Sequence, residues 1–514
     1  RTIPAPMTHK SGTLAVCFLG VVSSLQLIDP TVANTALVKA GQTLHMQGAT
    51  LALAASISTL AQAASVLLMG FLGDRLGRRR LIMASLVLAI AGDGIALLAP
   101  SAPLFLLGRA LVGIGVGSAL ASSFAAVRAV SRPEELGRSL GLWNLLIIAG
   151  FVVGSLLGGW LADSSWRLAL GLVPLISLLC LPLVPALLPT MPANPDLRAD
   201  GPGLISIAAA MVLFLTGVSH AMNGLTAPAF WIPTLAGVVL FGVHGLIERK
   251  RQEPIFPIAL YGRGCFAAAI VSGIAWNFAQ AVVQLQTSNF WQVVQHYSTS
   301  QVALAQLPLL ICFGVGGVLA GRLMAPGRRT TQLMAVGAIG LVLGLALLAG
   351  IQASSAYAAF VPSLMLVGLG LAFLSVPQSA LFVQEAPARS FGSVTAFRTT
   401  TGQLGFALGF AASGAMVNGF GFASLRERLL RLGARPAELP ALEAKVREAL
   451  SHGVLSQGNG NGAPSKVIEV LTSSYASGLT GTMLVVALLV ALLSCITLLL
   501  LVIGHQQQQR QVAG

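Results

Sequence analysis

The sequence predicts an all-α membrane protein with fourteen transmembrane helices, because its composition, its apolar runs and its basic residues all favour this fold class. Of the 514 residues, 55% are hydrophobic and only 9% are charged, whereas a soluble domain has about 25% charged residues. The mean hydropathy is +0.83. Apolar runs that can cross a hydrocarbon layer of about 30 Å as helices recur along the whole chain. We therefore expect no soluble catalytic domain.

Fourteen apolar runs are long enough to be candidate spans. In chain order they are residues 11–38, 49–70, 81–99, 103–129, 140–162, 166–188, 203–222, 230–246, 266–291, 302–323, 333–351, 358–383, 394–423 and 479–503. An even number of spans places both termini on the same side of the membrane.

The basic residues indicate which side faces the cytoplasm. They gather in the short loops on the side of the N-terminus, for example at Arg78, Arg79 and Arg80, whereas the short loops and span ends of the other side hold only Lys39 and Arg167. Orientation follows the basic residues of short loops. We therefore expect a multi-pass protein of the bacterial inner membrane with cytoplasmic N- and C-termini, and the net charge of +14 does not indicate nucleic-acid binding.

A charged loop follows the second candidate span. Gly70, Asp74, Arg75, Gly77 and Arg78 stand in it with the spacing Gly-x-x-x-Asp-Arg-x-Gly-Arg. Glycines permit a tight reversal, and a carboxylate beside several arginines can form and break ion pairs between helix ends. A generic basic turn would explain the arginines but not this spacing, so we predict a gating loop.

This loop resembles the signature loop of the major facilitator superfamily, and further motifs resemble its fourteen-span drug/proton antiporter branch, the EmrB/QacA type. The matching residues are Asp29, Thr31 and Asn34 in the first span, Arg109, Gly113, Gly115 and Gly117 in the fourth, and Gly150, Gly154, Gly158 and Gly159 in the fifth. The resemblance implies proton or substrate handling at Asp29, a membrane-embedded arginine at Arg109 and an antiporter motif at the glycines of the fifth span. Ser155 stands where the family has a proline, which removes a kink-forming residue.

A degenerate second copy of the charged loop, from Gly321 to Arg329, follows the tenth span and lacks the aspartate. Its position favours two related halves. We expect an N-terminal six-helix bundle at 1–190, two inserted transmembrane helices with linkers at 191–260, and a C-terminal six-helix bundle at 261–514. His220 and His244, in the inserted spans, are expected to be structural.

An outer loop at 424–477 interrupts the apolar pattern. Its stretches 425–432 and 440–450 have helical apolar spacing with charges between, and 457–464 is a Gly/Asn-rich linker. This spacing predicts a helical hairpin that rests on the outer membrane face. A disordered insertion is the alternative.

Three charged residues, Asp29, Asp93 and Arg109, lie inside predicted spans. A charge at the bilayer centre costs about 2.5 to 3.5 kcal/mol on insertion scales, so each needs a partner or water. At about 1.5 Å of rise per residue, all three lie at similar depth. We predict a proton-titrating cluster, with a fixed ion pair between Asp93 and Arg109 as the alternative.

The ninth span has polar and aromatic residues at helical spacing. Asn277, Gln280, Gln284 and Trp291 are predicted to share one face, beside Trp276. Together with Asn34 they form the predicted substrate cavity. A polar seam between helices is the alternative.

These features predict a proton-coupled secondary transporter that exports lipophilic or cationic compounds by alternating access, as in multidrug efflux. Export of a lipid or lipid-conjugate is the alternative, and a membrane receptor or scaffold is the candidate from a different class. The sequence has no Gly-x-x-x-x-Gly-Lys-[Ser/Thr] loop, no hydrolytic constellation and no metal-ligand spacing among its cysteines. We therefore expect no enzyme, no cofactor and no metal. The expected partners are a small lipophilic substrate or lipid, protons and membrane lipids, and the expected state is a monomer.

Overall fold

The structure is a computed structural model of the whole chain. It describes residues 9–46, 48–191, 193–194, 201–220, 227–250, 258–324, 328–387, 391–431, 435, 439 and 465–513. Within these ranges, twelve helices are long and apolar enough to cross a membrane, and two shorter apolar helices lie at Trp166–Cys180 and Leu307–Leu323. The predicted all-α membrane fold is therefore confirmed, and the number of helices agrees roughly with the fourteen predicted spans.

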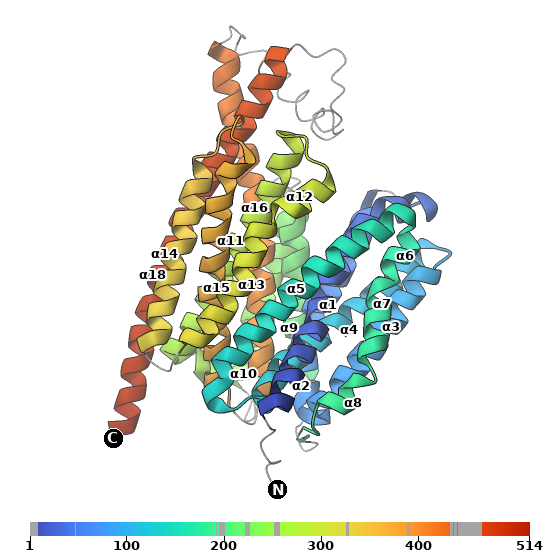
Figure 1. Cartoon of the computed structure of the whole chain (residues 1–514), viewed down its shortest axis with the longest axis vertical. Coiled ribbons are helices and arrows are strands. Elements are labelled where there is room, and N and C mark those ends of the chain that lie inside the picture. The colour runs from blue at the N-terminus through green and yellow to red at the C-terminus, as the bar shows by residue number, and fades with distance from the viewer. Residues whose placement is uncertain are drawn as a thin grey trace.

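The N-terminal helices run up and down through the molecule (Figure 1). They are α1 (His9–Thr43), α2 (Gly48–Leu76), α3 (Arg78–Leu98), α4 (Ala102–Val130), η1 (Pro133–Glu135), α5 (Leu136–Ser164), α6 (Trp166–Leu170), α7 (Leu172–Cys180) and α8 (Leu183–Leu187). The predicted sixth span, 166–188, is thus three short helices rather than one. The breaks fall at Gly171 and at Pro182, and a proline has no backbone N–H with which to continue a helix.

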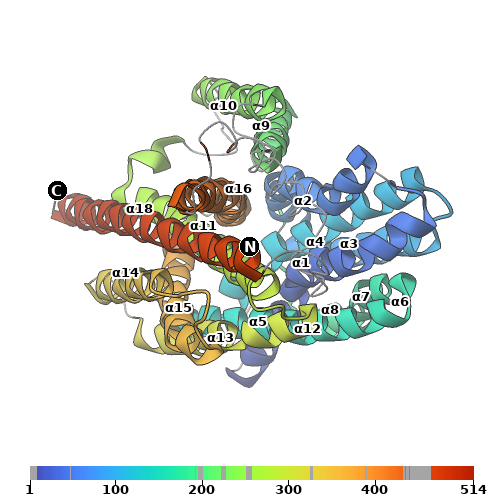
Figure 2. The same ribbon diagram turned by 90° about the horizontal axis from the view of Figure 1, so that it is seen from above.

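Two helices in the middle of the chain lie at the edge of the molecule. These are α9 (Gly201–Ser219) and α10 (Pro228–Arg249). Viewed from above, α9 lies beside α2 and α10 lies farther out (Figure 2). Most of the α10 side chains are uncovered, Ile232 and Val239 among them, so this helix presents an apolar surface to lipid.

The C-terminal helices form a second group. They are η3 (Ile258–Gly262), α11 (Gly264–Val293), α12 (Thr299–Ala305), α13 (Leu307–Leu323), α14 (Arg328–Ala349), η4 (Tyr357–Ala359), α15 (Phe360–Glu385), α16 (Phe391–Arg431) and α18 (Ser465–Ala513). The two groups meet where α5 packs on α13 and where α2 packs on α16. The predicted tenth span, 302–323, is divided at Gln306, directly before the Leu307–Pro308 start of α13, since proline is favoured in a first helical turn.

The predicted outer loop differs from the structure at both ends. Helix α16 continues to Arg431 and α18 already begins at Ser465, so 424–431 and 465–477 extend two long helices past their neighbours (Figure 1). Leu425 is buried and Arg428 donates to the hydroxyl of Ser477, which pairs the two extensions. The predicted second hairpin helix at 440–450 and the linker at 457–464 lie outside the described residues.

Candidate functional site

Helix α4 is held close to both α2 and α3 by small residues. A Cβ at Gly113 would collide with the backbone of Ser58 on α2, and a Cβ at Gly115 would lie 2.8 Å from the backbone nitrogen of Ala89 on α3. Glycine removes these clashes and lets the helices approach. The side chain of Arg109, one turn earlier on α4, can therefore reach its neighbours directly.

Arg109 binds two aspartates from two other helices. Its Nη1 donates to Asp29 Oδ1 at 2.5 Å and to Asp93 Oδ1 at 2.9 Å, and its Nη2 donates to Asp29 Oδ2 at 2.9 Å. The three residues are at most 1% exposed. The structure thus brings Asp29, Asp93 and Arg109 together in what we call the central cluster, and Arg109 is shared between both acids rather than paired with Asp93 alone.

The two carboxylates of the central cluster have different surroundings. Both oxygens of Asp29 are bonded, because Ser58 Oγ also donates to Asp29 Oδ2 at 2.6 Å. Oδ2 of Asp93 is buried without a hydrogen-bond partner among the described residues. Two ionised carboxylates and one guanidinium leave one excess negative charge, which is costly to bury. Uptake of one proton would make the cluster neutral, and Asp93 Oδ2 is the carboxylate oxygen of the cluster that accepts no hydrogen bond from the described residues.

The glycines of the predicted antiporter motif lie against the helix that carries Asp29. A Cβ at Gly154 would come within 2.7 Å of Ile28, and Gly150 and Gly158 face Ser24 and Val32 in the same close manner. Ser24, Ile28 and Val32 are four residues apart, so they lie on one face of α1. This face packs directly against the glycines of α5. Gly159 differs, because a Cβ there would meet nothing within 4 Å. The motif therefore fixes the position of α1 on both sides of Asp29.

The predicted gating loop is shorter in the structure than in the sequence prediction. Gly70 and Asp74 belong to α2, Arg75 completes its last turn, and α3 begins at Arg78. Only Gly77 lies between the two helices, and its φ of 89° is the left-handed conformation that glycine adopts without strain. Gly70 lies within α2 and takes no part in the reversal of the chain. It permits close contact between α2 and α16 instead, since a Cβ there would lie 2.7 Å from the carbonyl oxygen of Gly392.

Asp74 joins the two groups of helices. Its Oδ1 accepts from Arg78 Nη2 at 2.7 Å, and its Oδ2 accepts from the backbone N–H of Gly392 at 2.5 Å. Gly392 is in the first turn of α16, where unsatisfied N–H groups and the helix dipole favour an anion. Asp74 and Arg78 were predicted to form a latch between the two halves; in the structure their ion pair joins the end of α2 to the start of α3, and the contact with the other group runs from Asp74 to Gly392.

Phe391 and Arg128 complete this contact, and the sequence prediction included neither. The guanidinium groups of Arg78 and Arg128 lie 4.8 Å and 4.7 Å from the centroid of the Phe391 ring. Arg128 also donates to the carbonyl oxygen of Val383 at 2.9 Å. We call Asp74, Arg78, Arg128, Phe391 and Gly392 the gate cluster.

The structure brings together only some of the residues that were predicted to line a substrate cavity. Asn277, Gln280 and Gln284 are all half-buried along α11, as residues on one face would be. Trp291 is 0% exposed and packs against the rings of Tyr297, Tyr357 and Phe360. It therefore fills the end of the C-terminal group instead of lining a cavity with the other three.

The remaining two cavity residues also differ in their surroundings. Asn34 is exposed on α1. Trp276 is 7% exposed, packs edge-on against Phe313 and donates to Gln378 Oε1 at 3.4 Å. Gln378, which sequence reasoning did not include, is 0% exposed and donates to the carbonyl of Ala269. A polar contact between α11 and α15 thus lies where an open binding surface was predicted.

Arg398 on α16 is a further candidate residue that the sequence prediction used only for topology. Its Nε donates to Ser379 Oγ at 2.6 Å, and its guanidinium lies 4.9 Å and 5.3 Å from the ring centroids of Phe124 and Trp143 in the N-terminal group. No carboxylate within ion-pair distance is found for it in the described part of the chain. The sequence signal was an arginine inside the polar run from Thr395 to Gln403.

A drug-resistance protein and an efflux pump are similar in sequence to this chain over most of its length. The puromycin resistance protein pur8 of Streptomyces alboniger is 27% identical over 402 residues, which are 75% of this chain and 78% of that protein. The multidrug efflux pump LfrA of Mycolicibacterium smegmatis is 25% identical over 434 residues, which are 81% and 83% of the two chains.

Solved structures share the fold. The crystal structure of the human organic anion transporter MFSD10 (TETRAN) has a TM-score of 0.56 at 14% identity and covers 94% of this chain and 100% of its own. A bacterial homologue of the lysosomal transporter Spinster, in an inward-facing and unoccupied conformation, has a TM-score of 0.55 at 17% identity and covers 96% and 98%. A family model described as Major Facilitator Superfamily matches residues 16–410. The chain therefore belongs to the Major Facilitator Superfamily, and it is a multi-pass membrane transporter of small molecules and not an enzyme.

Proposed function

We propose that this transporter exports lipophilic or cationic compounds in exchange for protons and belongs to the fourteen-span drug antiporter branch of its family. The observation that carries the proposal is the central cluster, in which one buried arginine is shared by two buried carboxylates. Such a cluster differs by one proton between a neutral and a charged state. The names of the relatives, which are resistance and efflux proteins, support the substrate class.

The coupling would act through α1. When a proton binds an aspartate of the cluster, that carboxyl loses its charge and its attraction to Arg109 weakens. Arg109 then shifts toward the remaining carboxylate. Because Asp29 lies on α1 and α1 fits closely against α5, a displacement at Asp29 is passed to α5 and from there to α13. Protons entering from outside would thus favour one arrangement of the two groups and substrate the other.

The same proposal assigns the gate cluster to the cytoplasmic side. We infer cytoplasmic termini, a bacterial inner-membrane location, and two six-helix bundles (1–190 and 261–514) with an inserted pair at 191–260, in a monomer. The N-terminal part of α5 also lies close to α13, where a Cβ at Gly137 would be 2.9 Å from the carbonyl of Gly321. Close contacts at this end support a state that is closed toward the cytoplasm.

The test is transport in proteoliposomes with an imposed pH gradient. Asp93→Asn and Asp29→Asn should each abolish proton-driven accumulation of a lipophilic cation, because one carboxylate and one guanidinium are already neutral and the excess negative charge that favours proton uptake is gone. Glu385→Gln is the matched control, since this buried carboxylate pairs with Arg263 outside the central cluster. Proton-driven transport at the wild-type rate in both aspartate variants would refute proton coupling at this cluster.

Export of a lipid is the second candidate, and the long helical extensions of α16 and α18 support it (Figure 1). They could guide an acyl chain away from the outer opening. Replacement of 426–476 by a short Gly/Ser linker should then reduce export of a fluorescent lipid and spare a small cation. Equal loss of both substrates, with normal expression, would contradict this assignment.

A further inference from the structure

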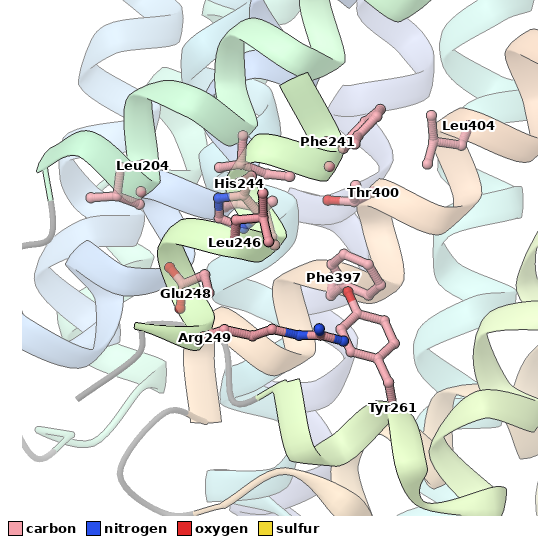
Figure 3. Close-up of a pocket in the computed structure, with 15 residues that line it drawn as sticks. Leu204, Phe241, His244, Leu246, Glu248, Arg249, Tyr261, Phe397, Thr400 and Leu404 are labelled. Carbon is pink, nitrogen blue, oxygen red and sulfur yellow. The ribbon is translucent and has the colours of Figure 1, made fainter. Parts of the chain in front are cut away.

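A cavity of about 530 Å³ lies beside the inserted helices, away from the central cluster. It is bounded by α2, α9, α10, η3 and α16 (Figure 3). Apolar side chains make most of its wall, among them Leu67, Ile207, Phe241, Leu246, Phe397 and Leu404. Its volume is within the range of about 300–1,000 Å³ that is typical of ligand sites. We call it the lateral cavity.

The lateral cavity runs inward from one end of a membrane-spanning helix. The span of α10 ends at Arg249, and α10 lines the cavity from there back to Phe241. Helix α16 lines it from Phe397 to Leu404. At 1.5 Å per residue, these stretches are about 12 Å and about 10 Å long. The cavity therefore begins at the depth of the membrane surface and extends into the hydrocarbon layer, as a lipid molecule does.

Glycines of α10 leave the apolar part of the cavity open. Gly242 and Gly245 both line it, and a Cβ at either position would meet nothing within 4 Å. A Cβ at Gly237, in contrast, would lie 2.6 Å from the backbone of Phe214 on α9. Leu246 lines the cavity and is also 58% exposed on the lipid-facing side of α10. An acyl chain can therefore reach this chamber from the membrane.

An exposed arginine lies at the polar end of the cavity. Arg249 lines the cavity and extends toward Tyr261 (Figure 3). Among the residues that the structure describes, its guanidinium forms no ion pair. The Tyr261 ring is held edge-on against the rings of Phe266 and Phe397, at centroid distances of 6.0 Å and 6.1 Å, so it forms a fixed wall beside the guanidinium. This end of the cavity therefore presents an accessible positive charge.

The neighbouring acid does not cancel this charge. Glu248 also lines the cavity, but it is 2% exposed and has an interaction within the protein. Figure 3 shows the side chains of Glu248 and Arg249 directed to opposite sides. His244 likewise interacts within the inserted pair, because its Nδ1 lies 3.1 Å from Ser206 Oγ and links α10 to α9. Of the charged residues that line the cavity in the described ranges, Arg249 is thus the one that a ligand can reach.

We propose that the lateral cavity binds an anionic phospholipid, with its phosphate on Arg249 and one acyl chain along the apolar wall. The fork of N–H donors of an arginine matches phosphate oxygens. A headgroup of net negative charge fits best, because the accessible charge at this end is positive. Such a lipid would contact the inserted helices, α2 and α16 at once, and would hold the inserted pair against both groups of helices. Its binding is separate from the export proposed above.

The experiment measures the lipid that stays bound to the purified chain, by native mass spectrometry. Protein is equilibrated in detergent with equal amounts of phosphatidylglycerol and phosphatidylethanolamine that have the same acyl chains. We expect phosphatidylglycerol to be retained about fivefold more, which corresponds to about 1 kcal/mol from one basic residue at an anionic headgroup. Arg249→Gln should bring this ratio close to one. Gly245→Leu, which fills the chamber, should reduce the retention of both lipids.

Two variants are matched controls. Lys250→Gln removes the neighbouring exposed positive charge, which does not line the cavity, and Gly419→Leu adds a leucine side chain at a glycine of α16 that also has open space around it. Both should retain lipid as the wild type does. Equal retention of the two lipids by the wild type would overturn the proposal, and so would a ratio that falls as far in Lys250→Gln as in Arg249→Gln, because the preference would then come from a diffuse basic surface. Unchanged retention in Gly245→Leu would equally overturn it, since no acyl chain would then occupy the cavity.

Discussion

Replacement of Asp74 by asparagine tests whether the gate cluster holds one end of the transporter closed. The variant keeps an oxygen that can accept the Gly392 N–H. It loses the charge that pairs with Arg78 and that faces the first turn of α16. A hydrogen bond to a charged group contributes about 1.5 to 3 kcal/mol, and a charge at a helix N-terminus about 0.3 to 1 kcal/mol. We therefore expect a loss of about 2 kcal/mol, which favours the open gate roughly 30-fold.

The measurement is the rate at which a maleimide labels a cysteine at position 396, in a background without the native cysteines. Ala396 is 0% exposed, and a Cβ at Gly70 would lie 2.6 Å from it, so it is protected while the gate is closed. Asp74→Asn should raise the labelling rate by about the same factor and lower turnover more than ligand affinity. Glu427→Gln, which breaks an exposed ion pair with Arg431 within α16, is the control. An unchanged labelling rate together with lost turnover would show that Asp74 acts in some other way.

Three further substitutions test the packing around the two clusters. Gly154→Val should lower the thermal stability and the turnover together, because its side chain would collide with Ile28 and displace α1; wild-type turnover would argue against the coupling path through α1. Phe391→Leu removes two cation–π contacts, worth about 0.5 to 2 kcal/mol each, and should raise labelling at position 396 as Asp74→Asn does; a slower rate would contradict the gate assignment. Arg398→Gln should raise the same rate with little effect on thermal stability, since its contacts with Phe124 and Trp143 join the two groups; no change in the rate would leave Arg398 without a gating function.

The central cluster could be anticipated from sequence because depth along a helix follows from residue position alone. Asp29, Asp93 and Arg109 were expected at one depth, and the structure has them in hydrogen-bond contact. Which acid faces Arg109 depends on how each helix is rotated about its axis. That rotation is set by close approaches such as Gly113 against Ser58, and spacing within one helix does not determine it.

Other residues show where sequence patterns stop being informative. Trp291 has the helical spacing of the polar face of α11, but it lies at the end of that helix, where Tyr297 and Tyr357 from other segments cover it. Phe391 lacks any local signal, because its two arginine partners come from helices far away in the chain. Contacts of this kind depend on how the N-terminal and C-terminal groups of helices dock. Basic residues that served only to predict topology, such as Arg128, therefore did not indicate them.

Helix α4 connects the two clusters physically. Arg109 near its start belongs to the central cluster, and Arg128 near its end belongs to the gate cluster. At 1.5 Å per residue, the two arginines are about 28 Å apart along the helix axis. Between them, Gly113 and Gly115 bring α4 into close contact with α2 and α3, so we expect these helices to move as one group. Under the proposed proton coupling, a proton that changes the pull of the two aspartates on Arg109 would act on the same group of helices that contacts Phe391 and Gly392 of α16, and the position of that group would determine whether the gate contacts form.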